Sequence, residues 1–122
     1  MSTEIIVLLE DYSTESVSPT FTYTEKGIGA GYHNLNNSLH TAVYRVDSFV
    51  GTIKLQGTLA LDPSDSDWFD IENTTKGDDS TLITNPDNPV VSQSVNFTGN
   101  FVWIRAGHIL EDGTIQSIHY NF

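Results

Sequence analysis

Four aspartates lie close together in one short stretch of the chain, at a spacing that could place several carboxylates around a cation. Carboxylate oxygens are hard ligands of the kind that calcium prefers, and one loop can wrap the ion with several of them. The stretch departs from the EF-hand pattern, because the glycine expected at the sixth loop position and the terminal glutamate are both missing. A solvated turn therefore explains these residues better, and calcium is the competing hypothesis. The residues are Asp62, Asp65, Asp67 and Asp70.

Trp68 and Trp103 are the two tryptophans of the chain, and both could stack on sugar rings. Aromatic platforms of this kind are found in carbohydrate-binding modules, which are commonly β-sandwiches of this size. Both side chains also lie within strand-like patterns, where aromatic residues usually belong to the core. We expect core positions for both, with sugar stacking as the alternative.

The other residues that could do chemistry lack the partners that the chemistry needs. The chain has no Gly-x-Ser-x-Gly, and its histidines show neither His-x-His nor His-x-x-x-His spacing. The glycine-rich stretch 27–31 lacks the Lys-Ser/Thr of a phosphate-binding loop. We therefore expect no enzymatic activity and no cofactor. The histidines are His33, His40, His108 and His119.

Charge narrows the range of partners. Sixteen acidic residues against five basic ones give a formal net charge of -11, which repels nucleic-acid phosphates and anionic membranes, so we expect neither as a partner of the chain. Cysteine is absent, which excludes disulfides and zinc-thiolate sites. The apolar run 5–9 is too short to span a bilayer and has no basic leader, so we expect a protein made and kept in a cytosol, or released from it by lysis.

The clearest structural signal is the alternation of apolar and polar residues over 51–61, which predicts a strand with one buried face. Gly57 lies on that face, where a glycine can mark a bulge. The preceding stretch 39–50 alternates in the same way, and 48–51 looks like a connection, so we predict a hairpin between the two stretches. The expected buried residues are Ile53, Leu55, Leu59 and Leu61 in the later stretch, and Ala42, Tyr44, Val46 and Val50 in the earlier one.

Turn residues divide the rest of the chain into short segments. Glu111-Asp112-Gly113 predicts a second hairpin turn, between strands at 101–106 and 115–122. The polar stretch 73–89 predicts a long surface loop, and the glycines of 27–31 predict a flexible connection. Further strands are expected at 5–9, 20–24 and 68–71.

These segments predict one domain over 1–122, with an extended N-terminal arm at 1–12 as an option. Seven or eight short strands without helical crossovers favour an all-β fold. We expect an antiparallel β-sandwich of the jelly-roll or immunoglobulin-like type, with a small β-barrel as the alternative.

Two parts of the sequence, read together, carry a family resemblance. The first is GTIKLQGTLALDPSDSDWF at 51–69, and the second is NFTGNFVWIRA at 96–106 with GTIQSIHYNF at 113–122. They resemble small virion structural proteins of tailed bacteriophages, especially those of T4-like and marine cyanobacterial phages.

The resemblance implies a non-enzymatic virion protein, assembled in the host cytoplasm, that decorates the capsid or forms part of the neck, tail or baseplate. Its partners would be other virion proteins, met as a homo-oligomer or in many copies on a lattice. A carbohydrate-binding module or adhesin-like tip is the alternative, with Trp68 or Trp103 as the stacking platform. Termini and long loops can extend from a compact domain to contact a partner, and the segments expected to do so are 1–12, 27–31 and 73–89.

Overall fold

In the part of the chain that the structure describes, seven antiparallel strands form one hydrogen-bonded sheet, whose main path runs β1-β7-β4-β5. The computed structural model describes residues 5–13, 20–29, 38–77 and 90–121. Within these residues there is no helix long and apolar enough to cross a membrane. The elements are β1 (Ile6–Tyr12), β2 (Thr22–Tyr23), β3 (Gly27–Ile28), β4 (Ser38–Thr58), the 3-10 turn η2 (Asp65–Asp67), β5 (Phe69–Asp70), β6 (Val90–Gly99) and β7 (Trp103–Asn121).

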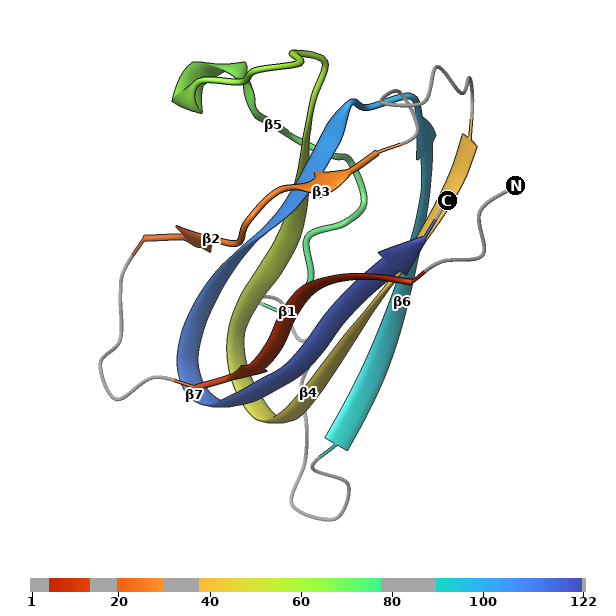
Figure 1. Cartoon of the computed structure of the whole chain (residues 1–122). Helices are drawn as coiled ribbons and strands as arrows, with labels where there is room; N and C mark the ends of the chain where they lie inside the picture. Colours follow the sequence, from red (N-terminus) through yellow and green to blue (C-terminus); the bar gives the residue numbers. More distant parts are fainter. Residues whose placement is uncertain (1–4, 14–19, 30–37, 78–89, 122) are drawn as a thin grey trace.

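Two very long strands organise the fold. β4 has 21 residues and β7 has 19, and they pair with each other from Thr41↔Asn121 to Thr58↔Trp103. Figure 1 shows both strands curving together at the lower end of the view, so that the two halves of the ribbon face each other. The curvature turns one sheet into two layers, and the prediction of an all-β antiparallel fold is confirmed.

Each layer takes one half of each long strand. The first layer contains the N-terminal half of β4 and the C-terminal half of β7, with β6 beside β4 and β1 beside β7. The second contains the other two halves, with β5 beside β4 and the short strands β2 and β3 beside β7. Two buried tyrosines connect the layers, because Tyr44 donates a hydrogen bond to the carbonyl of Thr74 and Tyr120 to that of Ile28.

The bend replaces both predicted hairpin turns. The β4–β7 pairing changes register around Val50, and the positive φ angles of Ser48 (52°), Gly51 (151°) and Gly113 (84°) absorb the extra residues. A Cβ atom on Gly113 would lie 2.3 Å from the carbonyl oxygen of Ser48, so this close approach requires glycine. The predicted turns at 48–51 and 111–113 are therefore wrong, because both segments are bulges within continuous strands.

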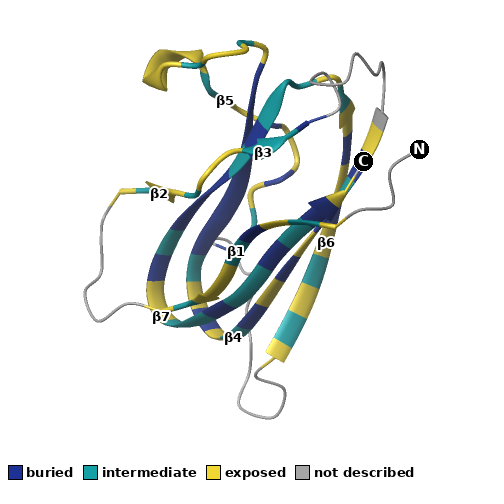
Figure 2. Cartoon of the chain, in the orientation of Figure 1, coloured by how far each residue is buried: buried dark blue, intermediate teal, exposed yellow. Residues whose placement is uncertain are grey.

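The core lies between the layers, where Figure 2 shows bands of buried residues on both limbs of the long strands. The alternation was informative within the strands: Ala42, Tyr44 and Val46 are buried, as are Ile53 and Leu55.

The predicted burial fails where the regular strand geometry ends. Leu59 and Leu61 are 68% and 71% exposed, because β4 ends at Thr58 and the period-2 pattern has no sheet to follow beyond it. Val50 is exposed as well, since the bend reverses the parity and buries Phe49 instead. Gly57 is not a bulge; the register is regular there, and the ring of Phe101 lies where its side chain would be.

The remaining segments differ in smaller ways from expectation. Residues 6–12 of the optional N-terminal arm form β1 and pair with β7, so this part is a strand of the sheet. Gly27–Ile28 forms β3, and β6 is a ten-residue strand where none was predicted. Of the predicted loop 73–89, Thr74 is buried and Lys76 bridges to Ile53, whereas 78–89 lies outside the described residues. The rest of the glycine stretch, 30–31, also lies outside them.

Candidate binding surfaces

The aspartates proposed as calcium ligands do not converge on one point. The carboxylate of Asp67 accepts hydrogen bonds from the backbone N–H and the hydroxyl of Ser64, at 2.8 and 3.1 Å, and so closes the 3-10 turn η2. Asp70 lies in β5 and forms an ion pair with Lys54 at 2.9 Å. Over the part of the chain that the structure describes, no group of three or more His, Cys, Asp or Glu residues is arranged to hold a metal ion. The calcium hypothesis for Asp62, Asp65, Asp67 and Asp70 gains no support.

Asp70 belongs to a small polar network on the outer face of the second layer. Its carboxylate accepts a hydrogen bond of 2.9 Å from the side-chain amide of Gln56, and Gln56 in turn accepts one of 2.9 Å from Nε of Arg105. The hydrogen bond from Gln56 and the charge of Lys54 hold the pKa of Asp70 below its usual value. The network therefore keeps one carboxylate charged among two cations.

Both tryptophans lie outside the core, contrary to expectation, and each carries a cation over its ring. The guanidinium of Arg105 lies 4.3 Å from the ring of Trp68 and 4.0 Å from that of Tyr23, so it is held between two aromatic rings. Lys26 lies 5.1 Å from the ring of Trp103, whose indole N–H donates a hydrogen bond to the carbonyl of Leu61. At least one ring face of each tryptophan is therefore already occupied.

The cation–aromatic surface, as we name this face, gathers three of the five basic residues of a strongly acidic chain: Lys26, Lys54 and Arg105. A polar pocket of about 250 Å³ lies beside them, lined in part by Tyr23, Trp68 and Arg105. The pocket is large enough for a small hydroxylated or anionic group. No sequence signal located it, because its residues come from β2, β7 and the segment before β5.

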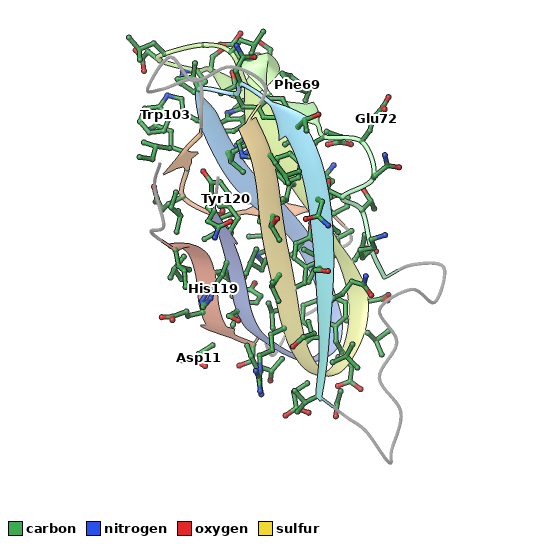
Figure 3. The ribbon with its side chains drawn as sticks, turned by 90° about the vertical axis from the view of Figure 1, so that its right-hand side faces the viewer. Asp11, Phe69, Glu72, Trp103, His119 and Tyr120 are labelled. Atoms are coloured by element: carbon green, nitrogen blue, oxygen red, sulfur yellow. The ribbon has the colours of Figure 1, made fainter. Side chains whose placement is uncertain are left out.

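A second opening lies between the two layers beside β6. It has a volume of about 600 Å³ and is lined by Phe69, Phe97 and Phe101, among others. Figure 3 labels Phe69 and Glu72 of this opening beside the upper end of β6. The opening exists because the ten residues of β6 in the first layer are matched by the two residues of β5 in the second.

The free edge of β6 is the third surface. β6 pairs with β4 in an unbroken ladder of ten residue pairs, from Asp47↔Val90 to Ser38↔Gly99, and no described strand pairs with its other side. Its sequence VVSQSVNFTG contains no charge and no proline. Side chains alternate between the interior and the solvent, and the outward ones are Val90, Ser92, Ser94, Asn96 and Thr98.

The other edges of the described sheet carry the features that usually prevent strand addition. β1 has a bulge between Val7 and Leu9 and two adjacent acidic residues, Glu10 and Asp11. β2, β3 and β5 have two residues each. β6 has none of these protections, because it is long, regular and uncharged.

Two of the histidines that the structure describes, His40 and His108, are buried and pack against aromatic rings. His40 is buried, its Nε2 lies 3.0 Å from the carbonyl oxygen of Gly99, and its ring stacks on Phe97 with centroids 4.7 Å apart. His108 is buried against the ring of Tyr12. Burial lowers the pKa of both. His119, labelled in Figure 3, is half-buried on β7, and His33 lies outside the described residues.

Comparison of the chain with protein-family models, with curated proteins and with solved structures found no match. The arrangement of these three surfaces is therefore the basis for a functional proposal.

Proposed function

We propose that this domain is a non-enzymatic structural protein of a bacteriophage virion, which works by binding other virion proteins. Capsid decoration and a place in the neck, tail or baseplate are the two forms this role would take. The lineage rests on the sequence resemblance over 51–69, 96–106 and 113–122. The mode of action rests on the surfaces.

The observation that carries the proposal is the unprotected edge of β6. An edge strand presents a row of backbone N–H and C=O groups that can pair with a strand from another chain. Ten regular, uncharged residues provide enough ladder for such pairing, whereas every other described edge is short, bulged or charged. Strand addition is therefore the contact that this surface fits best.

Cosedimentation tests the role directly. Purified protein is mixed with phage particles, with empty capsids and with tails, and the pelleted fraction is measured against a sample without particles. Saturable binding in a fixed number of copies per particle is the expected result. If the protein stays in the supernatant with all three, the virion role is wrong.

Sugar binding is the second candidate, because the pocket of about 250 Å³ lies beside Trp68 and Tyr23. The cations over Trp68 and Trp103 reduce the aromatic surface that a sugar ring could use. Titration with a panel of neutral and acidic glycans, followed by tryptophan fluorescence, distinguishes the candidates. A saturable change that disappears in Trp68→Ala would favour the glycan role over assembly.

A further inference from the structure

We propose that two copies of this chain pair edge to edge through β6, antiparallel, about a two-fold axis at Ser94. The inference rests on the proposed function, since it names one partner for the assembly surface defined above. Pairing of this kind joins the first layers of two molecules into one continuous sheet, in the order β1-β7-β4-β6 followed by its two-fold mate.

Charge is the first reason to choose a second copy as the occupant. Two chains of net charge -11 repel each other wherever their acidic residues meet. β6 has no charged residue along its ten positions, so at this edge the two backbones can approach without placing like charges opposite each other. The same strand offers no charge that would select an acidic or basic partner.

The sequence of β6 is also complementary to itself. A two-fold axis at Ser94 places Gln93 opposite Val95, Ser92 opposite Asn96 and Val91 opposite Phe97. Each residue then faces one that points to the same side of the sheet, as an antiparallel ladder requires. The pair Val91 and Phe97 is a β-branched residue opposite an aromatic one, a combination that stabilises paired strands.

The opening between the layers supports the same register. Phe97 lines this opening together with Phe69 and Phe101, where the two-residue β5 leaves the interior uncovered. In the proposed pairing the partner copy's strand continues the first layer past β6, with an apolar valine next to Phe97. Phe97 itself is only 7% exposed, so the partner's valine would add packing at the rim of this opening.

Disulfide cross-linking tests the position of the two-fold axis. The chain has no cysteine, so any disulfide must form through the one that is introduced. In Ser94→Cys the two Cα atoms would lie about 4.5 to 5.5 Å apart, within the range of a disulfide. Mild oxidation should convert most of this variant into a covalent dimer. In Asn96→Cys the two sulfurs belong to positions four residues apart, about 13 Å, so it should stay uncross-linked. Ser66→Cys, on the exposed η2 turn, is the control for random collisions.

Introducing a charge at Ser94 tests the same contact without a covalent bond. Light scattering should give the wild type a mass of twice 13.5 kDa. Ser94 points to solvent, so Ser94→Lys leaves the fold intact and should weaken the dimer about fivefold or more by placing two like charges at the axis. Ser94→Glu should do the same, and a mixture of the two variants should recover the dimer. Ser66→Lys makes the same charge change away from the edge and should leave the mass unchanged.

The outcomes separate this inference from the proposed function. A monomeric wild type that still cosediments with particles overturns the β6 pairing and leaves the virion role standing. A dimer that persists in Ser94→Lys, or that cross-links equally through Ser66→Cys, overturns the interface. A dimer that cross-links through Ser94→Cys but ignores particles supports the pairing and counts against the virion role.

Discussion

Val50 of β4 lies directly opposite Asp112 of β7, at the point where both long strands leave their regular register. The pair marks the bend that divides one curved ribbon into two facing layers. Next to it, Gly113 has a φ of 84°, and Ser48 has a φ of 52°. The architecture therefore depends on a few backbone conformations that side chains tolerate poorly.

Gly113→Ala should lower the free energy of unfolding by about 2 kcal/mol or more. The new Cβ would lie 2.3 Å from the carbonyl oxygen of Ser48, and alanine disfavours the left-handed region. Urea unfolding followed by circular dichroism measures the loss. Ser48→Gly is the control, because glycine adopts the positive φ of this position without strain. It should leave the free energy of unfolding unchanged or slightly higher. Equal losses in both variants would contradict this account of the bend.

Tyr44→Phe should destabilise the fold by about 1 to 3 kcal/mol, because it removes the 2.8 Å hydrogen bond to Thr74 and leaves a buried carbonyl without its donor. Thermal unfolding at neutral pH measures the change. Tyr23→Phe removes a hydroxyl from an exposed side chain and should change stability by less than about 0.5 kcal/mol. A Tyr44→Phe variant as stable as the wild type would show that this bond between the layers contributes nothing.

Acidification from neutral pH should destabilise the protein through His40 and His108, which are both buried. The folded pKa values of His40 and His108 lie below the ordinary value of 6.5. As the pH falls, these histidines therefore bind protons in the unfolded chain before they do so in the folded protein. Their contribution to the free energy of unfolding is fully present above pH 6.5 and is lost as the pH falls from there toward the folded pKa values. Urea unfolding at a series of pH values measures the slope. His108→Leu should flatten it over this window, whatever its effect on stability at neutral pH; an unchanged slope would exclude His108 as a contributor.

The ion pair between Lys54 and Asp70 should add less than about 1 kcal/mol, because the Asp70 side chain is 54% exposed. The ion pair exists only while the Asp70 carboxyl is ionised, and the pKa of that carboxyl is lower in the folded protein than its ordinary value of 3.8. The stabilisation is therefore fully present above pH 3.8 and disappears as the pH falls through the folded pKa of Asp70. Asp70→Asn should therefore be slightly less stable than the wild type at pH 7 and equally stable in strong acid. A difference that persists in acid would point to lost packing or hydrogen bonding instead.

The predicted strands were most reliable where they depend on local periodicity. Alternation in 39–50 and 51–61 located Tyr44, Val46, Ile53 and Leu55 in the core, since the two sides of a strand are a property of the backbone itself. The two predicted hairpins failed for a physical reason. Glycine and aspartate supply the same positive φ angles to a tight turn and to a bulge, so the local sequence of 111–113 is compatible with both.

Residues far away in the sequence decide whether such a segment forms a turn or a bulge. A strand continues through a bulge only if its partner continues too, and the partner of 47–51 lies some sixty residues later in β7. The same holds for Arg105, which lies between Tyr23 and Trp68 because β2, β7 and the segment before β5 meet on one face. The sequence shows that these three residues are an arginine and two aromatic residues, but it does not show that they contact one another.

The sequence by itself determined that this chain forms antiparallel strands, which of its positions alternate between core and solvent, and that its charge is strongly negative. The tertiary structure decided that two of the strands run unbroken through the bend, that three cations share one aromatic face and that no other described strand pairs with the outer edge of β6. Periodicity and charge are local or additive properties of residues, whereas pairing, bending and edge exposure depend on which distant strand lies alongside.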